Sequence, residues 1–325
     1  MRLATLRDES RDGEPVVIDH SATRYLSARG IAPHLQGLLD DWWRAEPALR
    51  ELERRLALED GAALPLADRH LEAPLPRAYE WIDGSAYLNH VVLVRKARGA
   101  EPPLGLERDP LVYQGGSGTF LGPHAALSLP DPSWGLDFEA EIAVVLGDTP
   151  RGVRAHEAAA HVRLVVLLND VTYRNLVPAE LAKGFGFFNS KPSTAFAPYA
   201  VTPDELGARF RHGRVFVQLC STYNGVRIGD LATGPEMHFS FFELIEHVTK
   251  TRALTAGTVL GSGTVSNQDP KGGVSCLAEQ RARETIDGGT PTTPYMQPGD
   301  AIRIEAFDEH GWSPFGAIEQ RVNSV

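Results

Sequence analysis

Cysteine is scarce in this chain, which has only Cys220 and Cys276 among 325 residues. Two cysteines cannot build the disulfide framework of a small secreted domain, and a chain of this length buries a sufficient core without one. Neither belongs to a Cys-x-x-Cys pair, so the sequence gives no support for a zinc knuckle or a thioredoxin-type site. This usage is typical of a reducing compartment, and we expect a cytoplasmic protein.

Long hydrophobic runs and excess positive charge are also missing. No segment approaches the about 18 consecutive apolar residues of a membrane span, and the first residues carry no signal-peptide core. Lys and Arg number 32 against 42 Asp and Glu, a formal net charge of -10. Because such a chain offers no basic field for phosphates, we expect neither a nucleic-acid nor a membrane partner. A small acidic substrate stays compatible, since one cation in a pocket outweighs a distant net charge.

Hydrophobic periodicity predicts an α+β fold that is mainly β. In the N-terminal part, residues 3–19 predict a hairpin and residues 31–56 a helix. Proline-rich residues 57–78 predict a linker. We therefore expect a small N-terminal α/β domain over 1–75 and a larger domain over 76–325.

The larger domain contains several apolar runs of strand length. Strands are expected over 138–146, 162–168 and 301–305, and a helix over 241–248. Asn224-Gly225 predicts a hairpin turn, because both residues tolerate the positive φ that a type I′ turn needs. No regular alternation of strands and helices is present, which argues against a doubly wound parallel sheet.

Two glutamates in the expected strand 138–146 suggest a metal site. Alternate strand residues face one side, so Glu139 and Glu141 should point together, away from Phe138 and Ile142. Two like charges on one face repel and lose hydration, and a hard cation between them removes both penalties. The alternative is a half-exposed strand with both glutamates in water.

Three further residues extend this pattern. Asp170 ends the apolar run before it, where functional residues often stand, although a turn-forming Asp is the alternative. Asp83 and His90 are seven residues apart, which on a helix places one nearly above the other. The alternative for this pair is a helix N-cap and an ordinary surface histidine.

In chain order, these motifs resemble the fumarylacetoacetate hydrolase family over roughly residues 79–320. The matching positions are Asp83 with His90, Glu139 with Glu141, Asp170 with Arg174, Lys191 before small residues, Gly261-Ser262-Gly263-Thr264, and Glu279. Each motif is weak alone, and the specificity comes from six of them in order.

The resemblance implies a divalent-metal enzyme. It implies that one cation, with Mg²⁺ expected and Ca²⁺ or Mn²⁺ as alternatives, is held by Asp83, Glu139, Glu141 and Asp170. It implies a mixed β-roll catalytic domain preceded by a small N-terminal domain, usually as a homodimer.

The resemblance also implies catalytic roles. His90 is expected to be the general base that activates water, oriented by Glu279. Arg174 and Lys191 are expected to form the cationic part of an oxyanion site and to bind substrate. Thr264 and Tyr113 are expected as further substrate contacts.

Two departures from the family pattern bear on the reaction. Many members carry Arg-Asp-x-Gln after the metal aspartate, and the glutamine helps to bind the oxyanion. This chain has Arg174-Asn175-Leu176-Val177, with an apolar residue at that position. The match at Glu279 also needs an insertion of one residue.

These observations support three hypotheses. The first is hydrolysis of a carbon–carbon bond in a 2,4-dioxo or 3,5-dioxo acid, with fumarylacetoacetate, an intermediate of tyrosine breakdown, favoured over an acylpyruvate. The second is a metal-dependent decarboxylase, isomerase or hydratase of 2-oxo acids. The third is a degenerate, non-catalytic metal-binding protein. A His–Glu pair favours hydrolysis, and the missing glutamine weakens that argument.

Overall fold

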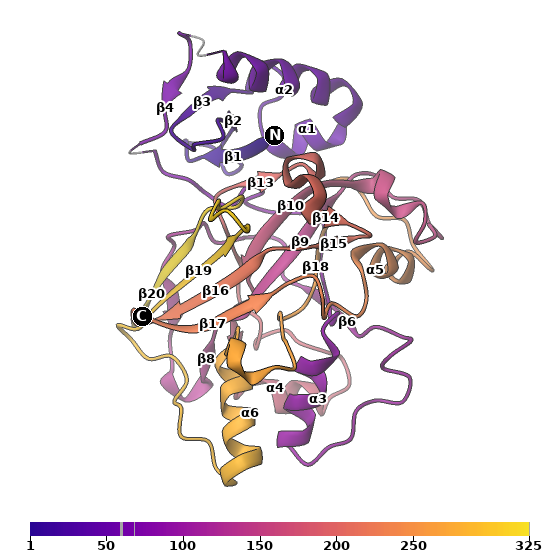
Figure 1. Cartoon of the computed structure of the whole chain (residues 1–325), viewed down its shortest axis with the longest axis vertical. Coiled ribbons are helices and arrows are strands. Elements are labelled where there is room, and N and C mark those ends of the chain that lie inside the picture. Colours follow the sequence, from indigo (N-terminus) through magenta and orange to yellow (C-terminus); the bar gives the residue numbers. More distant parts are fainter. Residues whose placement is uncertain (59–60, 68, 325) are drawn as a thin grey trace.

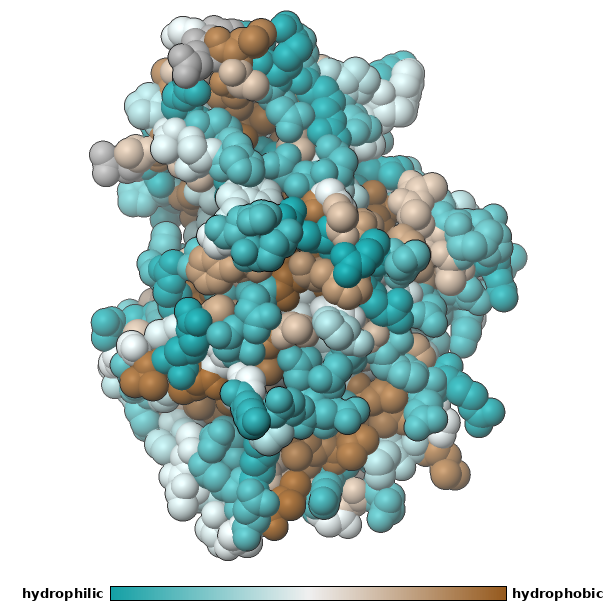
Figure 2. All heavy atoms as spheres, in the orientation of Figure 1, coloured by the Kyte–Doolittle hydropathy of each residue, from teal (hydrophilic) through white to brown (hydrophobic). Residues whose placement is uncertain are grey.

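The computed structural model describes residues 1–58, 61–67 and 69–324. These residues form two large β-sheets with helices at both ends of the molecule (Figure 1). The predicted α+β class, mainly β, is confirmed. Hydrophilic residues cover most of the face shown in Figure 2, with hydrophobic ones scattered among them. Within the described ranges, no helix is both long and apolar enough to cross a membrane.

The N-terminal segment packs two helices against four strands. Its elements are β1 (Arg2–Leu6), β2 (Glu14–Ile18), β3 (Arg24–Ser27), α1 (Leu35–Asp40), α2 (Trp42–Ala57) and β4 (Leu64–Pro65). The predicted hairpin is confirmed, since Leu3 pairs with Val17. The single helix predicted over 31–56 is wrong, because Asp41, with a φ of -129°, separates α1 from α2. Of the predicted linker, residues 59, 60 and 68 lie outside the described residues.

The larger sheet has eleven strands and runs from the N-terminal segment into the rest of the chain (Figure 1). Leu3 of β1 pairs with Ala200, which makes the connection. The order is β4-β3-β2-β1-β13-β10-β9-β18-β5-β6, and β12 also pairs with β10. The added strands are β5 (Trp81–Gly84), β6 (Val112–Gly115), β9 (Ala140–Leu146), β10 (Val162–Asn169), β12 (Ala195–Phe196), β13 (Ala200–Val201) and β18 (Val259–Gly261).

The second sheet is a five-stranded one in the order β17-β16-β19-β20-β7. Its strands are β7 (Leu127–Leu129), β16 (Gln218–Tyr223), β17 (Val226–Ala232), β19 (Ala301–Phe307) and β20 (Ile318–Ser324). The predicted turn between β16 and β17 is confirmed, with φ of 49° at Asn224 and 80° at Gly225.

The remaining elements are short. The helices are α3 (Leu88–Ala97), α4 (Val177–Leu181), α5 (Phe241–Val248) and α6 (Leu277–Gly288). Two small pairs are formed by β8 (Leu136–Asp137) with β11 (Thr172–Tyr173) and by β14 (Phe210–Arg211) with β15 (Arg214–Val215). Short 3-10 segments occur at Pro132–Trp134, Ala158–His161, Pro203–Arg209 and Pro270–Gly272, the third of them kinked at Gly207. The predicted helix over 241–248 coincides with α5.

The central strands β9 and β10 are covered on both faces. Ile142 and Leu167 belong to one apolar cluster, together with Ile304 of the second sheet. Ala143 and Val166 belong to another, together with leucines of α1 and α2. Because successive residues of a strand point to opposite faces, a strand buried on both sides reads as an unbroken apolar run. A charged residue on such strands therefore needs a specific reason to be there.

Candidate active site and metal centre

The register of the large sheet brings the first site residues together. Asp83 on β5 lies opposite Tyr113 on β6 and opposite Gly261 on β18. Gly261 in turn lies opposite Ala143 on β9, two residues from Glu141. Asp83 is thus a strand residue, and its prediction on a helix with His90 is wrong. Pairing on both sides of β5 holds this segment extended.

Three carboxylates form a compact buried triad. Asp83, Glu141 and Asp170 each offer an oxygen within 4.8 Å of the others, and their exposed fractions are 7%, 0% and 1%. Asp83 accepts a hydrogen bond from the amide of Gly263 (3.0 Å), and Asp170 accepts one from the Thr194 hydroxyl (3.0 Å). Neither Glu141 oxygen has a hydrogen-bond partner among the described residues. The alternative of glutamates in water is therefore wrong for Glu141.

The electrostatics of the triad fit a bound cation. Burial and the neighbouring Asp170 raise the pKa of Asp83 to about 8. Burial and the nearby carboxylates of Asp83 and Asp170 raise the pKa of Glu141 well above its usual range. An unpaired carboxylate is costly to bury, and oxygen-only clusters are the sites that Mg²⁺, Ca²⁺ and Mn²⁺ prefer. The residues present thus suit a divalent cation.

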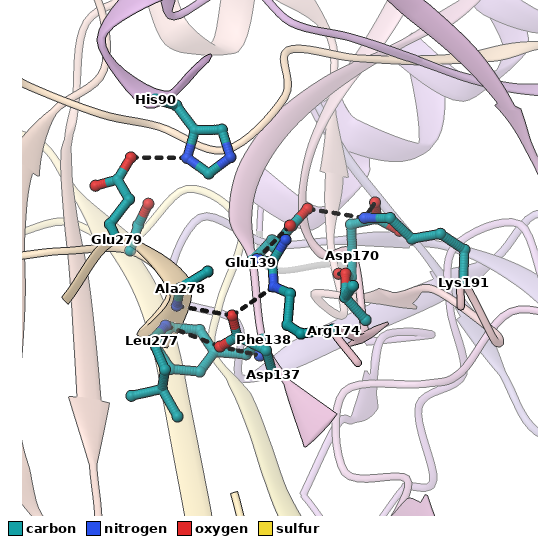
Figure 3. Close-up of polar contacts among 12 residues, drawn as sticks. His90, Asp137, Phe138, Glu139, Asp170, Arg174, Lys191, Leu277, Ala278 and Glu279 are labelled. Atoms are coloured by element: carbon teal, nitrogen blue, oxygen red, sulfur yellow. Dashed lines mark hydrogen bonds and ion pairs between the residues drawn. The ribbon is translucent and has the colours of Figure 1, made fainter. Parts of the chain in front are cut away.

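Glu139 lies beside the triad and pairs with two cations (Figure 3). Its carboxylate contacts the Arg174 guanidinium at 2.5 Å and the Lys191 ammonium at 2.9 Å. Lys191 also reaches Asp170, at 2.5 Å. Burial opposes ionisation of Glu139, but Arg174 and Lys191 outweigh it and lower its pKa. Lys191 thereby links Glu139 to the triad.

The strand predicted over 138–146 is interrupted at its start. β8 ends at Asp137 and β9 begins at Ala140, so Phe138 and Glu139 lie between two strands. The Glu139 amide donates to the Asn169 side chain (3.0 Å), and its carbonyl accepts from the Asp170 amide (2.9 Å). This break lets the chain turn from the large sheet toward β11.

The predicted pairing of His90 with Glu279 is present in the structure (Figure 3). His90 Nδ1 lies 2.7 Å from Glu279 Oε1, joining α3 to α6. Glu279 is fully buried, whereas the His90 side chain is 18% exposed. With the carboxylate as acceptor, Nδ1 carries the hydrogen and Nε2 keeps a free lone pair. That nitrogen is the one suited to accept a proton.

These groups line one cavity of about 180 Å³. Asp83, His90, Tyr113, Glu139, Arg174, Lys191 and Thr264 all contribute to its wall. Tyr113 donates a hydrogen bond to Asp170 (2.5 Å), and its ring packs edge-on against Phe187 at 5.1 Å between centroids. Val177, where the family glutamine is missing, is buried and lines the same cavity. All the predicted site residues therefore lie in or beside one pocket.

Sequence reasoning missed several groups here. Arg95 in the last turn of α3, the helix that carries His90, and Arg98 at its C-cap both line the cavity. Partial desolvation in the cavity and the nearby Arg174 lower the pKa of Arg98, although the residue is exposed on its outer side. The available signal was the position of Arg98, which follows Arg95 by three residues and His90 by two steps of four, because positions three and four apart share a helix face. The Gly263 amide, by contrast, is brought within hydrogen-bond distance of Asp83 only by the register of the sheet.

A larger cavity, of about 520 Å³, lies elsewhere, between the N-terminal segment and residues 75–79. Its wall includes Asp12, Arg77 and Tyr79 and none of the carboxylate triad. Asp12 and Arg77 are already paired with each other at 2.8 Å. Chemistry, rather than volume, therefore identifies the smaller cavity as the candidate site.

Comparison with known proteins agrees with this geometry. The 2,4-didehydro-3-deoxy-L-rhamnonate hydrolase of Sphingomonas sp. is 26% identical over 250 residues, 75% of this chain and 76% of that protein. A human mitochondrial oxaloacetate tautomerase is 24% identical over 237 residues, 67% of this chain and 70% of that protein. Maleylpyruvate hydrolase from Sphingobium sp., solved with manganese(II) and pyruvate, has the same fold, with a TM-score of 0.68 at 17% identity over 100% of this chain and 99% of that one.

Two family models cover nearly the whole sequence. Residues 80–323 match the fumarylacetoacetate (FAA) hydrolase C-terminal model, and residues 1–77 match fumarylacetoacetase N-terminal domain 2. The resemblance read from the ordered motifs is thus confirmed, and this chain belongs to the fumarylacetoacetate hydrolase family.

Proposed function

We propose that this chain is a divalent-metal-dependent enzyme that hydrolyses a carbon–carbon bond in a 2,4-dioxo or 3,5-dioxo acid. The favoured reaction is fumarylacetoacetate and water giving fumarate and acetoacetate. The observation that carries the proposal is the His90–Glu279 pair, at 2.7 Å, in which His90 lines the same cavity as Asp83 of the carboxylate triad. Hydrolysis of a dicarbonyl needs a base that activates water and a cation that polarises the carbonyls, and this site offers a position for each.

Each step has a residue suited to it. A divalent cation held by Asp83, Glu139, Glu141 and Asp170 would supply Lewis-acid polarisation of the carbonyls. His90 takes a proton from water, whose oxygen adds to the carbonyl carbon next to the alkene. When the bond to the central CH₂ breaks, that oxygen stays in fumarate, and the CH₂ carbon takes up a proton as the methyl group of acetoacetate. Arg174 and Lys191 stabilise the developing negative charge.

The charge of the cavity supports a substrate with two carboxylates. Arg95, Arg98, Arg174 and Lys191 all line it. Arg174 and Lys191 are paired with acidic residues of the site. Arg95 and Arg98 form no ion pair with a carboxylate among the described residues. Fumarylacetoacetate has a carboxylate at each end, so one end can meet the arginines of α3 while the dicarbonyl lies near the triad.

A second candidate is a tautomerase, isomerase, decarboxylase or hydratase of a 2-oxo acid. Val177 favours it, because an apolar side chain stands where a hydrogen-bond donor would assist the oxyanion of hydrolysis. The similarity to an oxaloacetate tautomerase is in line with this alternative. All these reactions stabilise an enolate, so the carboxylates alone do not separate them.

Further properties are proposed from family membership. We propose one bound cation, with Mg²⁺ first and Mn²⁺ or Ca²⁺ as alternatives, a homodimer, and a cytoplasmic location. We also propose a division into a domain over 1–75 and a catalytic domain over 76–325. Elemental analysis and sedimentation of the purified protein test the cation and the dimer.

The deciding experiment follows the ultraviolet absorbance of fumarylacetoacetate and, in parallel, of acetylpyruvate, with EDTA or with added Mg²⁺ or Mn²⁺. Metal-dependent loss, with fumarate and acetoacetate identified by chromatography, supports the proposal. Loss of neither compound, in protein shown to contain metal, rejects hydrolysis. Oxaloacetate tautomerisation and decarboxylation are then measured, and failure there as well leaves the non-catalytic hypothesis.

A further inference from the structure

A further buried carboxylate, Asp137, belongs neither to the triad nor to the cavity wall. Asp137, at the end of β8, is fully buried. It accepts hydrogen bonds from three backbone amides: Phe138 (2.9 Å), Leu277 (2.8 Å) and Ala278 (2.9 Å). The fourth donor is Arg174 Nε, at 2.8 Å (Figure 3). Asp137 thus joins three separate parts of the chain.

One set of these bonds fixes the start of α6. The residue before the helix, Cys276, gives no side-chain cap, so the first amides of α6 rely on Asp137. A carboxylate at a helix N-terminus satisfies free amides and interacts favourably with the helix dipole. Glu279 follows directly, in the same first turn, and its carboxylate holds His90. The position of Asp137 therefore affects where Glu279 meets the imidazole.

The other bond fixes Arg174. Its Nε donates to Asp137, while its Nη2 contacts Glu139 at 2.5 Å. A guanidinium that donates to one carboxylate and lies in ion-pair contact with a second is restricted in its orientation. Asp137 therefore affects both the direction of the Arg174 guanidinium at the cavity and the start of α6, the helix whose Glu279 contacts His90.

We propose that Asp137 is a positioning residue that sets Arg174 and the His90–Glu279 pair relative to one another across the cavity. The roles of these partners rest on the proposed function. Asp137 itself touches neither the triad nor the cavity, so its effect is transmitted through Arg174 and through the first turn of α6.

The first test is Asp137→Asn, which keeps the size of the side chain and removes its charge. We expect kcat to fall about 10- to 100-fold, as is usual for residues that orient the groups of a metal site. Metal content should stay at the wild-type value. Ser240→Ala is the matched control, because it removes a helix cap at α5 outside the site. The two variants are compared under conditions in which each has lost the same number of degrees of thermal midpoint. If Asp137→Asn then loses no more activity than Ser240→Ala, the proposal is overturned.

A double-mutant cycle separates positioning from a general loss of stability. If Asp137 acts through Glu279, then Asp137→Asn should reduce kcat much less in a Glu279→Gln background than in the wild type. Effects that multiply independently contradict action through Glu279. Action through Arg174 is tested by calorimetry of pyruvate binding to the Mn²⁺-loaded wild type and to Mn²⁺-loaded Asp137→Asn. We expect the affinity of the variant for pyruvate to be about 10-fold weaker.

A measurement without substrate or metal covers the case in which Asp137→Asn does not fold or the proposed function is wrong. Arg174→Leu removes one donor from Asp137 and leaves in place the amides of α6 that also donate to it. We expect amide exchange at residues 276–284 to become faster, because the remaining carboxylate loses its compensating charge. Unchanged exchange there overturns the coupling, whereas absence of wild-type turnover on every acid tested rejects only the proposed function.

Discussion

The imidazole of His90 and the carboxylate of Glu279 meet at 2.7 Å, although 189 positions separate them in the chain. The two residues come from α3 and α6, which lie side by side at the end of the molecule opposite the N-terminal segment (Figure 1). Glu279 is fully buried, and its second oxygen has no hydrogen-bond partner among the residues described. A buried carboxylate whose hydrogen bond goes to an imidazole is suited to orient that histidine, which is the role proposed for Glu279.

Replacing His90 by alanine should therefore remove turnover while leaving metal in place. General-base catalysis contributes typically about 100- to 10,000-fold, and we expect a loss in that range. The measurement is kcat together with metal content by elemental analysis. His156→Ala, at an exposed histidine, is the control and should keep wild-type rates. Wild-type turnover by the His90 variant would reject its role as base.

Glu141→Gln should separate metal binding from folding. Both Glu141 oxygens are buried without a hydrogen bond to any described residue, so removing the charge should leave the metal-free protein at least as stable as the wild type. Added Mg²⁺ or Mn²⁺ should stabilise the wild type, by about 2.7 kcal/mol at 100 times Kd, and stabilise the variant far less. Thermal unfolding with EDTA and with metal measures this. Equal stabilisation of both proteins would contradict the role of Glu141 as a ligand.

The arginines of α3 should affect substrates according to their charge. We expect Arg95→Gln combined with Arg98→Gln to raise KM for fumarylacetoacetate by about 10- to 100-fold, since lost charge-assisted hydrogen bonds are worth about 1.5–3 kcal/mol. KM for acetylpyruvate, which has a single carboxylate, should change little. Lys96→Gln, exposed on the same helix, is the control. An equal rise in KM for both acids would show that the arginines do not select a second carboxylate.

Glu180 should make stability depend on pH in a defined window. Its carboxylate accepts bonds from the amides of Phe188, Asn189 and Ser190 and from the Ser190 hydroxyl. Burial opposes ionisation, but these bonds outweigh it and lower the pKa of Glu180 to about 2. The folded-state pKa is thus below the unfolded value of about 4.3. This contribution is fully present above that value and is lost as pH falls through 2.

The test is denaturant unfolding of the wild type and Glu180→Gln at several pH values. At pH 7 the variant should be less stable by about 1–3 kcal/mol, and the difference should shrink below about pH 4. Glu107→Gln, at an exposed glutamate, should match the wild type throughout. A difference that does not change with pH would mean that the ionised carboxylate is not what holds residues 188–190.

Local sequence patterns predicted most elements whose stability is local. The helix over 241–248 begins at a capping box of Ser240 and Glu243, and the turn at Asn224-Gly225 needs only the residues within it. Predictions failed where distant pairing overrides the local pattern. Asp83 reads as part of a helix with His90, yet pairing of β5 with β6 and β18 holds it in a strand.

By itself, the sequence determined the family and the types of functional group available to it, because the acidic, histidine and basic motifs occur in the order typical of that family. Only the tertiary structure decided which groups meet. The triad joins β5, β9 and the end of β10, and Asp137 reaches α6 from 140 positions away. These contacts arise from strand register and from helices packing over a shared core, and neither property is encoded in the spacing of residues along the chain.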